Sequence, residues 1–153
     1  FFHVRPHKGS NHASIMATIQ EKQQALIQEF EFFDEWMDKY NYIIEMGKSL
    51  PTLPEDKKND DLLVPGCQSK VWLHVEKRDN KIVLSADADA IIAKGIVAML
   101  IEVFSDQPAK EVAGAQMKFI EDIGLKDHLS PTRANGLISM VKQIKYYALA
   151  FSA

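Results

Sequence analysis

The chain has 153 residues, of which 46% are hydrophobic and 25% are charged, and its formal net charge is −3. This is the composition of an ordinary globular domain, and the small negative charge argues against a broad cationic surface for nucleic acid. The longest apolar run, Ile96–Ile101, is far shorter than the roughly 20 residues of a membrane-spanning helix, so we expect one compact domain with neither a membrane nor a nucleic-acid partner.

The first segment of the chain differs from the rest. Residues 1–15 hold three of the five histidines and little apolar periodicity, and Met16 follows them directly. We interpret residues 1–15 as a vector-derived or otherwise non-native leader, and residues 16–153 as the domain. The alternative, a histidine-rich metal arm, is disfavoured because the spacing matches no closed metal site.

Two amphipathic helices are predicted next. Thr18 and Glu21 form a capping box, and Gly47 is typical of a helix stop. The apolar positions recur every three or four residues in two sets: Leu26, Phe30, Phe33 and Met37, then Trp36, Tyr40, Ile43 and Ile44. This pattern indicates two helices, or one helix bent near Asp34.

A charged loop and a β-hairpin follow. Residues 55–61 are nearly all charged or amide and predict a solvated loop, whereas residues 71–77 favour a strand. Residues 78–81 form a turn-type segment before a second strand at 82–85, which indicates a hairpin. Cys67 therefore falls in a turn immediately before a strand.

The remainder is predicted to be helical. Asp87 or Asp89 is a candidate cap for a central buried helix, and Pro108 and Pro131 are typical of first helical turns. A further short helix is expected before Gly124. The apolar faces comprise Ile91, Ile92, Ile96, Met99, Leu100 and Val103, then Phe119, Ile120 and Ile123, then Leu137, Val141, Ile144 and Leu149. The fold class expected is α+β, with a small antiparallel β-sheet packed against several α-helices.

Cys67 is the single cysteine of the chain. It cannot form an intramolecular disulfide or hold an iron–sulfur cluster alone, and a free thiol suits the reducing cytoplasm. A reactive cysteine needs access and a stabilised thiolate, which a turn containing Gly66 favours. The alternative is a buried structural cysteine that packs as a small hydrophobe.

The residues around Cys67 carry a resemblance to a known family. The run from Val64 to Trp72, VPGCQSKVW, resembles the GCQSxVW signature of the SufE family of cysteine desulfuration proteins, which includes the CsdE proteins. Three other stretches agree in order and spacing: Tyr42–Gly47 with Leu50-Pro51, Asp87–Ala90 with Lys94-Gly95, and His128–Arg133 with Gly136-Leu137. The match covers essentially residues 16–153.

The resemblance implies a sulfur acceptor and carrier with a fold similar to that of the IscU scaffold proteins. Cys67 would take persulfide sulfur from a partner cysteine desulfurase of the SufS or CsdA type, stimulate it, and pass sulfur toward a downstream iron–sulfur scaffold. Pyridoxal phosphate (PLP) would belong to the partner, and the chain itself would need no cofactor and no metal. It would act as a sulfur-transfer accessory protein more than as a stand-alone enzyme. The SufE or CsdE branch and a homodimeric state are left open.

Other loop and support residues follow from the same motifs. Gly66, Gln68 and Ser69 flank the cysteine; Asp89 is either a plain helix cap or a control on the loop; and Arg133 takes part in docking or borders the loop, or else faces solvent. Lys70 either favours the thiolate or faces solvent. We expect Cys67 to rest in an apolar pocket near Arg133 and Asp89, sheltered by residues 62–64.

Functions of two other classes are also compatible with a lone cysteine. A cysteine hydrolase would need His74 or His128 as the base that activates Cys67, and no cysteine-protease signature surrounds the cysteine. A noncatalytic adaptor would carry Cys67 as a structural residue. Tyr42 and Trp72 are expected in the core or on a strand face instead of in a substrate site.

Overall fold

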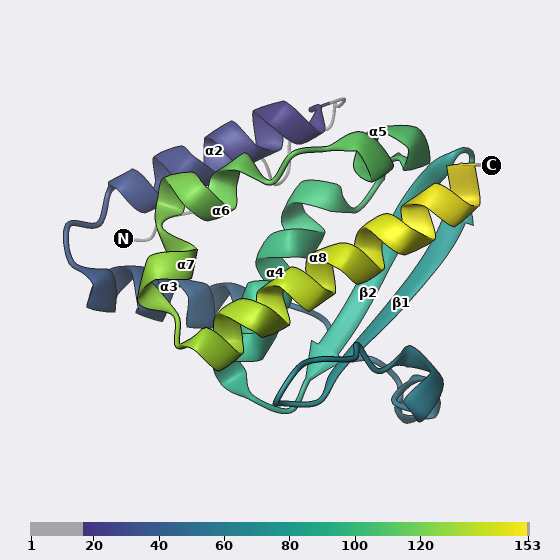
Figure 1. Ribbon diagram of the computed structural model, residues 1–153, viewed down its shortest axis with the longest axis horizontal. Coiled ribbons are helices and arrows are strands. Elements are labelled where there is room, and N and C mark those ends of the chain that lie inside the picture. Colours follow the sequence, from purple (N-terminus) through teal and green to yellow (C-terminus); the bar gives the residue numbers. More distant parts are fainter. Residues whose placement is uncertain (1–16, 153) are drawn as a thin grey trace.

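A computed structural model describes residues 17–152 of the chain. The interpretation of residues 1–15 as a leader lies outside these residues. The described part contains several helices and a small antiparallel sheet, and the long C-terminal helix runs beside the hairpin (Figure 1). The predicted α+β class is confirmed.

The first two helices form as the capping box and the apolar spacing indicate. Helix α2 spans Ile19–Glu31; Glu21 N–H donates to Thr18 Oγ1 at 3.1 Å, and Thr18 N–H donates to Glu21 Oε1 at 2.9 Å. Helix α3 spans Trp36–Lys48. The prediction of two helices in this region is confirmed.

The predicted helix stop at Gly47 is wrong. Helix α3 continues through Gly47 to Lys48, and Gly47 lies against Gly95 of α4, which spans Ile91–Phe104. A Cβ atom on Gly47 would stand 2.7 Å from Gly95 N, and one on Gly95 would stand 2.2 Å from the Ile43 carbonyl oxygen. Gly47 is therefore needed for the close approach of two helices, and helix termination is not its role.

A hairpin forms the sheet. Two 3₁₀ turns, η1 (Glu55–Lys57) and η2 (Asp60–Leu62), lie in the predicted solvated segment. Strand β1 (Val71–Arg78) then pairs antiparallel with β2 (Lys81–Ala88), from Val71 opposite Ala88 to Arg78 opposite Lys81. Asp79 and Asn80 have φ values of 51° and 69°, as a two-residue type I′ turn requires.

The second half of the chain adds one short strand and four helices. Strand β3 (Gln107–Pro108) pairs with the start of β2, so Pro108 precedes α5 (Ala109–Gly114) instead of lying in its first turn. Gly124, with φ 88°, ends α6 (Lys118–Ile123) as predicted. Helix α7 (Leu125–His128) was not expected, whereas α8 (Pro131–Ser152) begins at the predicted proline.

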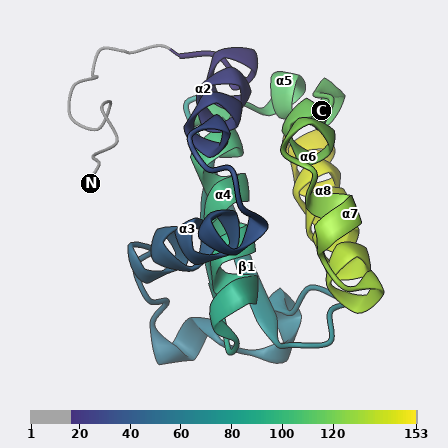
Figure 2. The ribbon, with the colours of Figure 1, turned by 90° about the vertical axis from the view of Figure 1, so that its left-hand side faces the viewer.

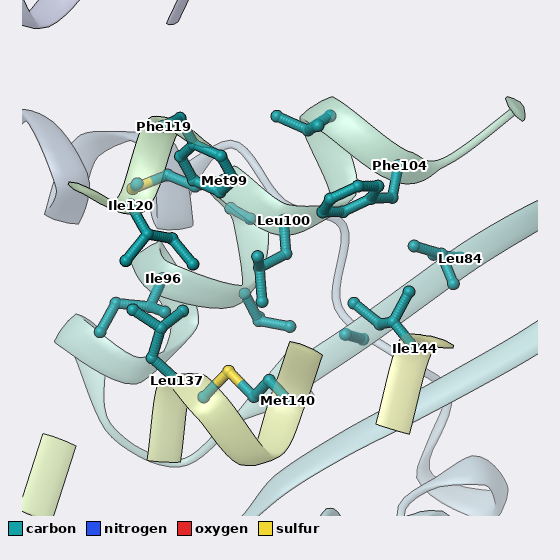
Figure 3. Packing of buried hydrophobic residues seen from close by; sticks show 14 of the residues in the cluster. Leu84, Ile96, Met99, Leu100, Phe104, Phe119, Ile120, Leu137, Met140 and Ile144 are labelled. Atoms are coloured by element: carbon teal, nitrogen blue, oxygen red, sulfur yellow. The ribbon is translucent and has the colours of Figure 1, made fainter. Parts of the chain in front are cut away.

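Helix α4 is the centre of the core, as its apolar sequence indicates. In Figure 2, α2, α3 and α4 gather on one side and α6, α7 and α8 on the other. Figure 3 shows how side chains of α4, α6, α8 and β2 meet: Ile96, Met99 and Leu100; Phe119 and Ile120; Leu137, Met140 and Ile144; and Leu84.

Three residues assigned to apolar faces are exposed instead. Met37 is 66% exposed, Ile91 67% and Leu149 63%. Met37 and Ile91 lie in the first turns of α3 and α4, and Leu149 lies near the end of α8. Helix ends project beyond the core, so periodicity overestimates burial there. None of the helices within residues 17–152 has the length and apolar character to cross a bilayer.

Candidate functional site

Cys67 belongs to the loop that connects η2 to β1. Figure 1 shows this loop at the end of the hairpin where α4 begins. The base of the loop is closed by Val64 N–H, which donates to the Val71 carbonyl at 2.9 Å. Gly66 has φ 86°, a conformation that glycine adopts without strain. The sequence predicts Cys67 in a turn immediately before a strand; the structure has the turn at Pro65 and Gly66, directly ahead of Cys67, and β1 begins at Val71.

The side chain of Cys67 is half-buried and lines a pocket of about 80 Å³. The loop, the start of β1, α4 and α8 all contribute to the pocket. Its lining residues are Cys67, Gln68, Ser69, Val71, Ile92, Ala93, Ile96, Thr132, Arg133, Gly136 and Met140. Of the six predicted site residues, the pocket brings together Cys67, Gln68, Ser69 and Arg133.

The expected shelter by residues 62–64 is wrong. Leu63 bridges to Trp72, and Val64 pairs with Val71, so this stretch runs along β1 instead of folding over the thiol. Apolar cover comes from Ile92, Ala93, Ile96 and Met140, residues of α4 and α8. Only the tertiary fold brings these side chains to the cysteine.

The environment of the sulfur favours the neutral thiol. Burial raises the pKa of Cys67 above its usual value. The thiol also donates a hydrogen bond to the Gly136 carbonyl, with Sγ and oxygen 3.6 Å apart. A carbonyl oxygen accepts from S–H and cannot donate to a thiolate, so this contact acts in the same direction as burial.

The start of α8 is shaped to receive the loop. A Cβ atom on Gly136 would stand 3.5 Å from Cys67 Sγ, and one on Gly66 would stand 2.6 Å from Ser139 Oγ. Gly136 and Ser139 are three residues apart and thus share one face of the helix. Gly66 therefore lets the loop lie close to the helix, whereas a Cβ atom on Gly136 would be at an ordinary van der Waals distance from the sulfur.

Asp89 is a loop contact and not a helix cap. Its Oδ1 accepts from Lys70 N–H at 2.9 Å, and its own N–H donates to the Lys70 carbonyl at 3.0 Å. The N-cap residue of α4 is Ala90, which makes no side-chain capping bond within the described residues. Asp89 therefore fixes the C-terminal end of the cysteine loop to the start of α4.

Asp87, the other predicted cap, is also placed elsewhere, since it lies in β2 and is 3% exposed. Its carboxylate is 3.2 Å from Lys94 Nζ and 3.3 Å from Lys58 Nζ, and it accepts from Leu53 N–H at 3.2 Å. Burial opposes ionisation, but the hydrogen bond from Ala88 N–H and those from Lys94, Leu53 and Lys58 together lower the pKa of Asp87. This carboxylate ties the segment ahead of the loop to the sheet and to α4.

Arg133 is exposed at the rim of the pocket. Its Nη1 donates to Tyr40 Oη at 2.9 Å, and its backbone N–H donates to Ser130 Oγ at 3.3 Å. The guanidinium is thus directed by α3 while its backbone belongs to the first turn of α8. It fits the expectation of an arginine that borders the cysteine loop.

The two histidines considered as hydrolase bases are not at the pocket. His128 stacks on Trp36, with ring centroids 4.3 Å apart, and its Nδ1 lies 2.9 Å from the Gly124 carbonyl. His74 lies in β1 opposite Ser85. The pocket lining contains neither residue, which removes the geometric basis for the hydrolase alternative. Among residues 17–152, no group of three or more His, Cys, Asp or Glu side chains is placed to hold a metal ion.

Comparison with known proteins places these features in a family context. Residues 24–148 match the model of the SufE family, described as an Fe-S metabolism associated domain. An uncharacterized SufE-like protein of Rhizobium etli is 42% identical over 125 residues, which cover 78% of this chain and 84% of the relative. A second one, of Rhizobium meliloti, is 41% identical over 125 residues, covering 78% and 89%.

A solved structure has a similar fold. The solution structure of a hypothetical protein from Thermus thermophilus aligns with a TM-score of 0.71 at 17% identity, and the alignment covers 85% of this chain and 95% of that one. At this identity the likeness concerns the fold alone.

Proposed function

Because the chain belongs to the SufE family, whose model is described as an Fe-S metabolism associated domain, we propose that Cys67 accepts and carries sulfur for iron–sulfur cluster assembly. The sulfur would come from the persulfide of a PLP-dependent cysteine desulfurase of the SufS or CsdA type. The chain would stimulate this partner and pass the sulfur to a downstream scaffold.

The observation that carries the proposal is the position of the single cysteine. Cys67 lies on a loop, not inside an apolar helix face, and its side chain lines a pocket of about 80 Å³. A structural cysteine would be surrounded by packed atoms without adjoining space. The pocket supports a cysteine that receives an additional atom.

The transfer is an exchange between sulfur atoms. The Cys67 thiolate attacks the terminal sulfur of the donor persulfide, a new S–S bond forms, and the S–S bond of the donor breaks. The donor cysteine leaves as a thiolate, so no external oxidant or reductant is consumed. Cys67 then holds the transferred sulfur as its own persulfide.

The resting state and the transfer state must differ. In the resting loop, burial and the Gly136 carbonyl favour the unreactive thiol. Attack on a donor requires the sulfur to leave this environment. A partner that binds the outward loop more tightly than the inward loop would shift the population toward the reactive form. Arg133 and Gln68 are exposed at the rim of the pocket and would be available to contact such a partner.

Intact-mass measurement tests the proposal. Incubation with a PLP-loaded cysteine desulfurase and free cysteine should add one sulfur atom, about 32 Da, to the chain, and dithiothreitol should remove it. Peptide mapping should place the added sulfur on Cys67.

Cys67→Ser is the matched control, because it replaces sulfur by oxygen at nearly constant shape. This variant should fold and remain unmodified while the desulfurase still forms its own persulfide. A wild-type chain that stays unmodified beside a persulfidated desulfurase would contradict the proposal.

A further inference from the structure

The contact between Cys67 and Gly136 involves a glycine that the resting thiol does not require. Gly136 is buried in the interior of α8, where glycine is less favourable than alanine. Its φ is not positive, since the described glycines with positive φ are Gly66 and Gly124. The backbone conformation therefore does not require a glycine at this position.

The unmodified cysteine does not require a glycine there either. A Cβ atom on Gly136 would stand 3.5 Å from Cys67 Sγ and 3.9 Å from its Cα and Cβ atoms, which are ordinary van der Waals distances. Alanine would fit against the thiol without displacing it. This differs from Gly95, where a Cβ atom would stand 2.2 Å from a backbone oxygen.

A persulfide on Cys67 needs more space beside Gly136 than the thiol does. An S–S bond is about 2.05 Å long, so an outer sulfur directed from Sγ toward α8 would collide with a methyl group 3.5 Å from Sγ. The pocket that Gly136 lines has a volume of about 80 Å³. This exceeds the ~10–15 Å³ that a cavity needs to hold one water molecule, so the pocket has room for one sulfur atom.

We infer that Gly136 reserves the space in which the outer sulfur of the Cys67 persulfide is held, between α8 and α4. The inference rests on the proposed function. It adds one residue, Gly136, whose free space accommodates Cys67 when the cysteine carries the persulfide. Ile92, Ile96 and Met140 supply the apolar part of the lining around this space. Gly136 acts here as a positioning residue, through the volume that it leaves free.

The test compares loaded and unloaded cysteine in the same variant. Wild type and Gly136→Ala are loaded with a small-molecule persulfide donor, in which the Cys67 thiolate takes the terminal sulfur and the donor leaves as a thiolate. Cyanide then removes the outer sulfur as thiocyanate, and the remaining persulfide is followed by intact mass. The half-life in Gly136→Ala should be shorter by about tenfold, the scale set by one excess methyl group in a packed site.

The unloaded protein supplies the discriminating readout. Alkylation of the Cys67 thiol by iodoacetamide should proceed in Gly136→Ala at the wild-type rate, and the melting temperature should not fall, because alanine fits beside the thiol. If Gly136 had only a structural role, its replacement would change the alkylation rate of the thiol and the half-life of the persulfide together. Gly114→Ala is the matched control, since a Cβ atom there would meet no atom within 4 Å in the described residues beyond its own helix backbone and chain neighbours.

Ala93→Val narrows the same pocket from α4 and should also shorten the persulfide half-life. This second variant tests the inference if Gly136→Ala fails to fold. Equal half-lives in wild type and the folded pocket variants would overturn the inference, as would a wild-type Cys67 that accepts no sulfur from the small donor. Failure of a desulfurase to load a wild-type chain that the small donor does load would instead contradict the proposed function.

Discussion

At the scale of the residue, the chemistry depends on the sulfur atom of Cys67 and on two features of its environment. Burial and the Gly136 carbonyl, 3.6 Å from Sγ, both favour the neutral thiol of Cys67. The thiolate is the nucleophile in sulfur exchange. In the resting loop the cysteine is therefore held in its less reactive, protonated form. Its reactivity depends on the conformation of the loop as well as on the thiol itself.

The raised pKa of Cys67 predicts how reactivity and stability change with pH. Alkylation of the isolated protein should have its pH midpoint above that of a small free thiol measured alongside. The folded-state pKa exceeds the unfolded one, so the thiol contributes stability below the unfolded pKa, about 8.5, and loses it as pH rises through the folded pKa.

Denaturant titrations check the second part. The free energy of unfolding of the wild type should fall relative to that of Cys67→Ala as pH rises above about 8.5. Parallel curves for the two proteins across this range would contradict the raised pKa.

At the scale of the element, the cysteine loop is held at both ends. Val64 pairs with Val71 at its base, and Asp89 pairs twice with Lys70, so residues 65–69 lie between two hydrogen-bonded attachments. The sequence predicts the turn because proline and glycine precede a β-rich run. It does not predict the Asp89 contact, because an aspartate two residues before a helix is equally typical of a cap.

Asp89→Ala tests this attachment. The substitution removes the acceptor of the Lys70 N–H, and losing a hydrogen bond worth ~1 kcal/mol should populate the outward loop about fivefold more. The alkylation rate of Cys67 should rise by the same factor, while the global unfolding transition changes little because the contact is exposed.

Asp122→Ala is a suitable control, since it removes an exposed aspartate that pairs with Lys118 on α6, outside the loop. An unchanged alkylation rate in Asp89→Ala, measured at the same pH as this control, would show that Asp89 does not restrain the loop.

At the scale of the whole molecule, contacts connect the stretches that resemble the SufE family, and the second and fourth of them, in chain order, line the pocket. Gly47 of the first packs against Gly95 of the third, Lys94 pairs with Asp87, and Gly136 of the fourth contacts Cys67 of the second. Periodicity and capping predict most helices and the hairpin, because those signals are local. The pocket could not be predicted in the same way, because Ile92, Ala93 and Met140 reach Cys67 only through tertiary packing.

The packing of α3 against α4 gives the last prediction, because α4 supplies one wall of the pocket. A Cβ atom on Gly95 would stand 2.2 Å from the Ile43 carbonyl oxygen, a backbone atom of α3 that cannot move without the helix. Gly95→Ala should therefore lower the free energy of unfolding by about 3 kcal/mol, at the upper end of the cost of overpacking. For a domain of this size the melting temperature should fall by roughly 10 °C.

Thermal unfolding measured by circular dichroism would reveal this loss, and Gly114→Ala should show none, because the space around its Cβ position is open in the described structure. The same displacement of α4 should change the positions of Ile92, Ala93 and Ile96 at the pocket. Folded Gly95→Ala protein should consequently alkylate at Cys67 at a rate different from that of the Gly114→Ala control. If the two variants melt together and alkylate at equal rates, the contact between α3 and α4 does not set the geometry of the pocket.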